Sequence, residues 1–151
     1  MLSLVTLPCL KDNYAFLIHD PETGVTALID APEAAPIQAA LDSRGWTLTH
    51  VLLTHHHWDH VEGLPGLALA PEVEVIGAAA DAHRLPPLTR PVQEGEPVQI
   101  GRATCHVIDV PGHTVGHVAF WFPQAGLCFT GDSLMAMGCG RLFEGTPAQM
   151  W

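Results

Sequence analysis

The chain has 151 residues, of which 48% are hydrophobic, and its formal net charge is −10 at pH 7. This length is sufficient for one domain whose core removes roughly two thirds of the unfolded surface from water, and the apolar content excludes a disordered chain. The acidic balance excludes nucleic acid as a natural partner, because phosphates require a basic surface.

Two features concern location. No apolar stretch reaches the ~20 residues that a membrane-spanning helix needs. Lys11 and Asp12 interrupt the early apolar run that a secretory signal would require. We therefore expect a cytoplasmic protein with no membrane partner. The protein is also expected to be a monomer. The cysteines show no Cys-x-x-Cys spacing, and buried thiols are the expected state in that compartment. They are Cys9, Cys105, Cys128 and Cys139.

Four strands are predicted in the first part of the chain, where short apolar runs are separated by turn-forming residues. They are expected at residues 2–7, 15–19, 25–30 and 48–54. Between the third and the fourth, Ile37 and Leu41 lie four positions apart among alanines, and Gly45 follows. This pattern predicts a short helix over residues 33–43 that ends at a glycine.

The segment directly after the fourth predicted strand, residues 54–60, reads Thr-His-His-His-Trp-Asp-His. Side chains two apart lie on one face of an extended chain, so His55 and His57 point the same way and can chelate one ion together. His56 is then expected to face away from the metal. Imidazoles with a carboxylate suit a borderline divalent ion such as zinc.

Asp59 and His60 are adjacent in sequence, so they aim at a different point once the chain turns toward a helix. A second ion close to the first is therefore predicted. The alternative interpretation is a histidine-rich polar loop or a tag. A tag would lie at a terminus and would lack the interposed Trp58 and Asp59.

In the middle of the chain the sequence patterns that indicate secondary structure or metal ligands are weaker. Residues 59–70 are predicted to form a second helix, which internal glycine and proline residues make irregular. A brief strand is expected at residues 74–76, followed by a turn of helix, and the Pro91 region is expected to be loop. Four histidines without a partner at ligand spacing are expected to be structural or solvent-facing. They are His19, His50, His83 and His106.

The second half is rich in predicted strands, at residues 98–100, 104–110, 117–122 and 127–130. A Pro-Gly pair ends the second of these and forces a turn that presents His113 at its tip. There His113 would be the third ligand of the ion held by His55 and His57. Three histidines leave one position open for water, as in a catalytic zinc site. His117 is interpreted as structural, with direct ligation as the alternative.

Asp132 follows the last predicted strand and is preceded by Gly131, which allows a close approach of the backbone. Taken alone, a Gly-Asp pair is most simply an ordinary turn. Its position after two metal motifs favours a different interpretation, in which the carboxylate reaches both ions and bridges them.

At this point the chain resembles the metallo-β-lactamase superfamily. The resemblance rests on Thr-His-x-His-x-Asp-His at residues 54–60, Pro-Gly-His-Thr-x-Gly-His at residues 111–117 and Thr-Gly-Asp at residues 130–132. Two further segments, residues 7–14 and 138–145, are similar to glyoxalase II, the hydroxyacylglutathione hydrolases. The match runs from about residue 4 to the last residue, so it covers nearly the whole chain.

The resemblance implies an αββα sandwich, an α/β fold of two mixed sheets flanked by helices, which would form one metal-binding domain over residues 1–151. It also implies a binuclear site with two divalent ions, zinc first, with iron or manganese tolerated. Carried over by position, the first ion is held by His55, His57 and His113, the second by Asp59 and His60, and Asp132 bridges.

The activity implied by the resemblance is hydrolysis of a glutathione thioester, S-D-lactoylglutathione, to D-lactate and glutathione. On this hypothesis Asp59 is catalytic, because it orients the attacking water and accepts its proton. Arg141 would meet a carboxylate of glutathione. Phe143 stands where the family often has a tyrosine, and simple core packing is the alternative for this residue.

The chain departs from the family pattern in two respects. No histidine follows His117, so the sixth protein ligand is missing, and the helical C-terminal domain that contacts glutathione has no counterpart. Thr146 and Pro147 would begin a helix that stops after one turn, which leads us to expect a fragment of a longer protein.

Three other functions stay open. A β-lactam hydrolase would be exported, and the absence of a signal argues against it. A persulfide dioxygenase-like enzyme would use a single iron. A metal-binding fragment would show little or no turnover.

Overall fold

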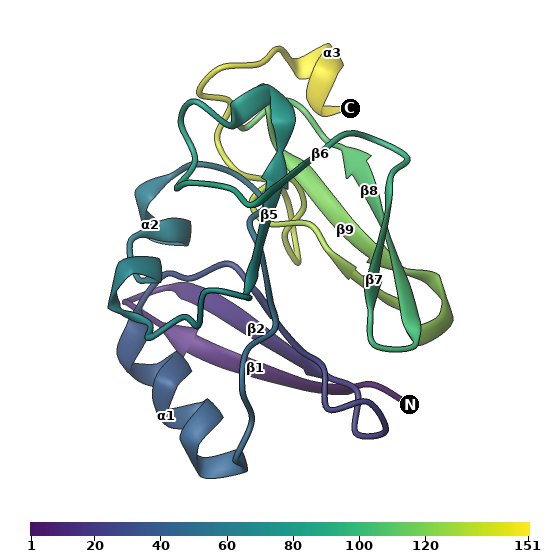
Figure 1. The fold of residues 1–151 in the computed structure, drawn as a ribbon. Helices are drawn as coiled ribbons and strands as arrows, with labels where there is room; N and C mark the ends of the chain where they lie inside the picture. Colours follow the sequence, from purple (N-terminus) through teal and green to yellow (C-terminus); the bar gives the residue numbers. More distant parts are fainter.

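The apolar runs of the sequence form ten strands in the computed structural model, which describes every residue from Met1 to Trp151. The strands make two sheets that face each other (Figure 1). The six-stranded sheet has the order β1 (Ser3–Cys9), β2 (Asn13–His19), β3 (Thr26–Ile29), β4 (His50–Leu52), β5 (Glu74–Ala78) and β6 (Arg90–Val92). The four-stranded sheet has the order β10 (Leu127–Phe129), β9 (Val118–Phe122), β8 (Ala103–Asp109) and β7 (Pro97–Ile100).

The first sheet is mixed, as predicted. Strands β1, β2 and β3 pair antiparallel, whereas β3, β4, β5 and β6 run parallel to one another. The second sheet differs from the expectation, because all of its pairs are antiparallel. Its strands follow one another through short connections, which suit antiparallel pairing and are too short for a parallel crossover.

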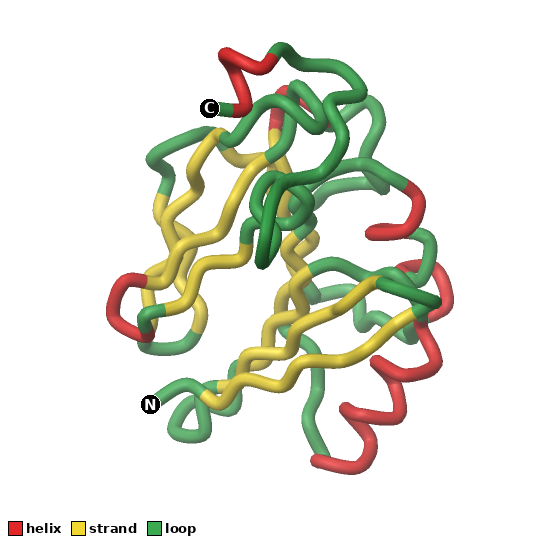
Figure 2. Tube along the Cα trace, turned by 180° about the vertical axis from the view of Figure 1, so that it is seen from behind, coloured by secondary structure: helices red, strands yellow, loops and turns green.

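Helix α1 (Ala34–Arg44) lies against the outer face of the first sheet, as Figure 2 shows from behind. It ends at Gly45, which adopts a left-handed conformation with φ 64°, in agreement with the predicted glycine stop. The second predicted helix is much shorter than expected. It consists of α2 (Trp58–Val61) and a separate 3-10 turn, η1 (Leu64–Gly66), because Gly63 follows α2 and Pro65 within η1 cannot donate a helical hydrogen bond.

Two apolar cores hold these layers together. Neighbouring residues of a strand point to opposite faces, so Leu17 packs toward α1 while Ile18 packs between the two sheets. The intersheet core also contains Phe120 and Phe122 of β9, and both are fully buried. Trp121 between them points to the outer face of the second sheet and is 43% exposed.

Several local expectations are corrected by the structure. The Pro91 region forms strand β6 and is not loop. Cys9 and Cys105 are buried as expected, but Cys128 and Cys139 are exposed. Two further 3-10 turns, η2 (Ala79–Asp81) and η3 (Pro123–Ala125), and the short helix α3 (Pro147–Met150) complete the chain. None of the helices combines the length and the apolar character needed to cross a membrane.

Candidate metal centre

The candidate site lies where the chain leaves several strands. The carboxyl ends of parallel neighbours meet at the same edge of a sheet, so the segments after β3 and β4 bring Asp30 and His55 together. The segments that follow β8 and β10 in the second sheet add His113 and Asp132 to the same place. The four segments are far apart in sequence and meet only because the two sheets face each other.

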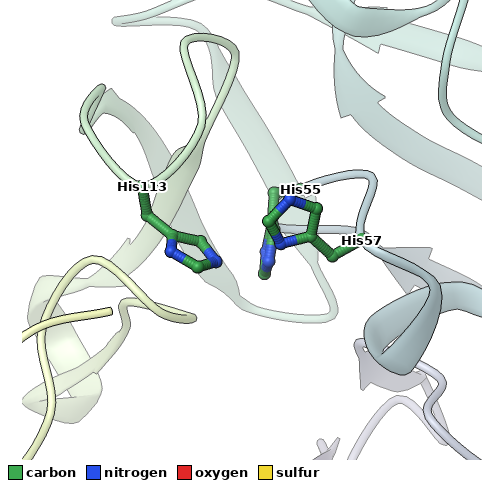
Figure 3. A group of neighbouring side chains, drawn as sticks. All are labelled: His55, His57 and His113. Atoms are coloured by element: carbon green, nitrogen blue, oxygen red, sulfur yellow. The ribbon is translucent and has the colours of Figure 1, made fainter. Parts of the chain in front are cut away.

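His55, His57 and His113 form the first cluster, with one ring nitrogen of each within 4.8 Å of the others. Figure 3 shows their rings turned toward a common point. Nε2 of His55 and Nε2 of His113 are buried and have no hydrogen-bond partner. Buried polar atoms are almost always paired, so converging lone pairs of this kind fit a bound cation.

Hydrogen bonds determine which nitrogen of these rings carries the proton. The hydroxyl of Thr54 donates to Oδ2 of Asp30 over 2.7 Å, so its oxygen accepts from Nδ1 of His55 over 3.0 Å. Nδ1 of His113 donates to the carbonyl of Arg141 over 2.6 Å, because a carbonyl oxygen only accepts. In the neutral tautomer that these bonds select, Nε2 of both histidines presents its lone pair to the cluster.

Asp59, His60 and Asp132 form the second cluster, again with ligand atoms within 4.8 Å of one another. Nδ1 of His60 donates to Oδ2 of Asp30 over 2.9 Å, which directs Nε2 toward the two other members. Nε2 lies 3.3 Å from Oδ1 of Asp132 and 3.9 Å from Oδ2 of Asp59.

Asp132 lies between the two clusters. Its Oδ1 faces His60, while its Oδ2 lies 3.2 Å from Nε2 of His113 and 3.9 Å from Nε2 of His55. Gly131 permits this placement, because its φ is 51° and a Cβ there would lie 2.6 Å from Oγ1 of Thr54. One carboxylate thus presents an oxygen to each cluster, the arrangement that a bridging ligand requires.

His117 has both ring nitrogens in use. Nδ1 donates to the carbonyl of Val118 over 3.2 Å, and Nε2 accepts from the backbone N–H of Asp132 over 3.2 Å. Burial lowers the pKa of His117 to about 4, so the ring is neutral at pH 7. These contacts agree with the interpretation of His117 as a supporting residue, which positions the backbone at Asp132.

Charge is distributed unevenly across the site. Burial and the neighbouring imidazoles lower the pKa of His55, and burial also lowers the pKa of His57, so both rings are neutral and can donate a lone pair. Burial alone would lower the pKa of His60 as well, but the carboxylates of Asp132 and Asp30 raise it to about 10. A cation in the second cluster would take the place of that proton.

Two residues of the site were not predicted from the sequence. Asp30 accepts from Thr54 and His60, and is 4% exposed. The side-chain amide of Asn13 donates to the carbonyl of Asp59 over 2.6 Å and to its Oδ2 over 3.0 Å. Asp30 is the last residue of a predicted strand, and this position at a strand end could have identified it as a site residue. No local pattern in the sequence singles out Asn13.

Arg141 and Phe143 lie beside the first cluster. The ring centroid of Phe143 is 5.4 Å from those of His57 and His113, and the guanidinium of Arg141 lies 5.3 Å from the centre of the phenyl ring. Phe143 is 59% exposed, which does not fit simple core packing. His56 faces away from the cluster, as predicted, toward Asp81 and Glu144.

A cavity of about 520 Å³ adjoins the second cluster at His60 and Asp132. Its walls are mainly apolar and come from β2, from β10 and from the segment after β10, including Phe16, Phe129 and Met135. The site is therefore open to a ligand from this side.

Facing sheets with histidine and aspartate clusters at their strand ends are typical of a divalent-metal protein. Residues 12–149 match the Metallo-beta-lactamase superfamily, and the chain belongs to that family. Among solved structures, the BLEG-1 B3 metallo-beta-lactamase is 19% identical and superposes with a TM-score of 0.87, covering 98% of this chain and 81% of the other. This likeness concerns the fold.

Two relatives are closer in sequence. A hydroxyacylglutathione hydrolase of Jannaschia sp. (strain CCS1) is 67% identical over 147 residues, which cover 97% of this chain and 57% of the relative. TTHA1623, solved in a di-iron-bound form, is 30% identical with a TM-score of 0.79, covering 97% of this chain and 80% of the other. The chain spans 57% to 59% of the length of the hydroxyacylglutathione hydrolases that it matches.

Proposed function

We propose that this chain is the metal-binding catalytic part of a hydroxyacylglutathione hydrolase, a thioester hydrolase that acts on S-2-hydroxyacylglutathione. The observation that carries the proposal is 67% identity to a relative of that name over 97% of the chain. The convergence of every predicted ligand supports it independently of the name, because six donor residues from three segments meet at one place.

The proposed cofactors are two divalent ions, zinc first, with iron or manganese as alternatives. Ligands of this kind do not select one metal, since imidazole and carboxylate accept several. The di-iron-bound form of TTHA1623, at 30% identity, supports two ions. The first would be held by His55, His57 and His113, the second by Asp59 and His60, with Asp132 shared between them.

Ions at these positions supply Lewis acidity, which activates water near neutral pH and polarises a thioester carbonyl. Asp59 is the proposed proton acceptor. Asn13 binds its Oδ2, which leaves Oδ1 without a protein hydrogen bond and able to receive the proton of the attacking water. The guanidinium of Arg141 would bind a carboxylate of glutathione, and the exposed ring of Phe143 would cover the side of His57.

The same proposal places the protein in the cytoplasm. Glutathione and reduced thiols belong to that compartment, and all four cysteines are unpaired in the structure. A monomeric state, and the absence of nucleic acid and membrane partners, stay predictions.

The test is hydrolysis of S-D-lactoylglutathione by the zinc-loaded protein. The reaction is monitored as the loss of thioester absorbance. We expect Asp59→Ala and His57→Ala each to lower kcat by at least about 100-fold, with His106→Ala, whose ring lies beside Trp121 on the outer face of the second sheet, as the matched control. Most of the activity surviving in either site variant would contradict the assignment.

Two results would favour the alternatives. Oxygen uptake with a single bound iron would indicate the persulfide dioxygenase-like activity. Tight zinc binding with no thioester hydrolysis would indicate a metal-binding chain without turnover.

A further inference from the structure

A network of charged side chains lies behind the first cluster, centred on Arg84. The guanidinium donates to Oδ1 of Asp81 through Nε over 3.1 Å and through NH2 over 2.8 Å. It also binds both carboxylate oxygens of Glu144, with 3.0 Å between NH2 and Oε2. Asp81 is only 2% exposed, so Arg84 is the cation that neutralises a buried carboxylate and joins it to Glu144.

Glu144 connects this network to the turn that carries His113. Its Oε2 accepts from the backbone N–H of Val115 over 2.9 Å, and the next residue, Gly145, donates its N–H to the carbonyl of Gly112 over 2.9 Å. Residues 140–145 are thereby tied on both sides of His113. The Arg84 side chain holds the pKa of Glu144 at about 2, so this carboxylate is ionised at any ordinary pH.

The tied segment also makes the hydrogen bond that orients His113. The carbonyl of Arg141 accepts from Nδ1 of His113, and Gly140 lies so close that a Cβ there would be 2.7 Å from the same nitrogen. Nε2 of His113 points into the cluster only while this carbonyl stays in place, because the bond determines both the tautomer and the ring orientation.

The other end of the network reaches the histidine motif. Nδ1 of His56 lies 3.5 Å from Oδ2 of Asp81, and its Nε2 lies 3.7 Å from Oε1 of Glu144. His56 stands between His55 and His57 in the chain, so the charged network contacts both segments that supply the first cluster.

We propose that Arg84 and Glu144 are positioning residues of the three-histidine site, whose ion pair holds residues 141–145 so that the Arg141 carbonyl keeps Nε2 of His113 aimed at the metal. This inference rests on the proposed function, since it concerns a metal that the three histidines would bind. Without the ion pair, Asp81 and Glu144 repel each other and the segment is free to move away from His113.

The chain contains a matched control for this experiment. Like Arg84, Arg102 binds one buried aspartate and one glutamate. It donates to both oxygens of Asp20, which is 0% exposed, and also pairs with Glu22. It contacts no residue of the candidate metal centre. Replacing Arg102 therefore removes an arginine and unpairs a buried aspartate, without touching the segment beside His113.

The experiment compares Arg84→Met, Glu144→Gln and Arg102→Met by zinc titration against a chromophoric chelator and by the visible spectrum of the cobalt-substituted protein. We expect the first two to weaken the tightest zinc site by about 10 to 100-fold and to shift the cobalt bands. Arg102→Met should stay within about threefold of the unsubstituted protein. The double variant Arg84→Met/Glu144→Gln should lose no more affinity than the worse single variant, since the two residues act as one unit.

Wild-type affinity and an unchanged cobalt spectrum in both site variants would overturn the inference while leaving the proposed function intact. So would unfolding of both variants when Arg102→Met folds, because the pair would then serve stability alone. Absence of tight zinc binding in the unsubstituted protein is a separate result, which would overturn the metal site and this inference with it.

Discussion

Oδ2 of Asp132 lies 3.2 Å from Nε2 of His113, and the other oxygen of the same carboxylate lies 3.3 Å from Nε2 of His60. His113 follows β8 of the second sheet, whereas His60 belongs to α2 beside the first. A single side chain thus connects the two clusters, and the spacing between two bound ions would depend on it.

Asp132→Asn is expected to reduce the number of tightly bound zinc ions from two to one. The substitution keeps the shape of the side chain but removes the charge that would be shared between two cations. Elemental analysis after dialysis measures the stoichiometry. Asp109→Asn at the end of β8 is the control, and two tightly bound ions in Asp132→Asn would contradict the bridging role.

Asn13→Ala is expected to lower kcat by about 10 to 100-fold with little change in KM. Its amide holds Oδ2 and the backbone carbonyl of Asp59, so its loss leaves the proposed proton acceptor less well oriented without removing a substrate contact. Steady-state kinetics separate the two parameters. A raised KM at unchanged kcat would show instead that Asn13 binds the substrate, and Gln99→Ala provides a surface control.

Thr54→Val is expected to lower the free energy of unfolding by about 1–3 kcal/mol, because Nδ1 of the buried His55 loses its hydrogen-bond acceptor and Oδ2 of Asp30 keeps only the bond from His60. Urea unfolding of the metal-free protein measures the change. Thr104→Val makes the same replacement at a surface position whose hydroxyl binds Gln99, and should be close to neutral. Equal effects at the two positions would show that the Thr54 hydroxyl has no special role.

Phe120→Ala is expected to cost about 3–5 kcal/mol of stability, because the side chain is fully buried between the sheets and leaves a cavity. The adjacent Trp121→Ala removes a larger side chain from the outer face, where 43% of the residue is exposed, and should cost much less. Denaturant unfolding measures the stability loss of each variant. A larger loss in Trp121→Ala than in Phe120→Ala would mean that the inner and outer faces of β9 are assigned wrongly.

Arg102 is expected to stabilise the protein only above acidic pH. Its guanidinium lowers the pKa of Asp20 well below the ordinary value of 3.8. A carboxyl with a depressed pKa in the folded state contributes stability that is present above its unfolded pKa and is lost as the pH falls through the folded one. The difference in Tm between the unsubstituted protein and Arg102→Met should therefore be largest near neutrality and shrink below pH ~4. An equal difference at every pH would contradict this.

Most strands were predictable because apolar runs and turn residues are local features of the sequence. The exception is β6, because its sequence contains Pro91 and therefore resembles the sequence of a loop. Proline lacks a backbone donor and is tolerated only where no neighbour needs one, and β6 is the edge strand of the first sheet. That edge position arises from the order of strands in the folded sheet, which no local pattern reveals.

The sequence by itself determined the chemistry of the site: imidazoles and carboxylates at strand ends, and a spacing of two that puts His55 and His57 on one side of the chain. Only the tertiary structure decided how these groups are held. Asp30, Asn13 and Arg84 each bind a partner far away in the chain, namely Thr54, Asp59 and Glu144, at separations of 24, 46 and 60 positions. Periodicity describes neighbours along one element, whereas contacts of this kind exist only after separate segments have packed together.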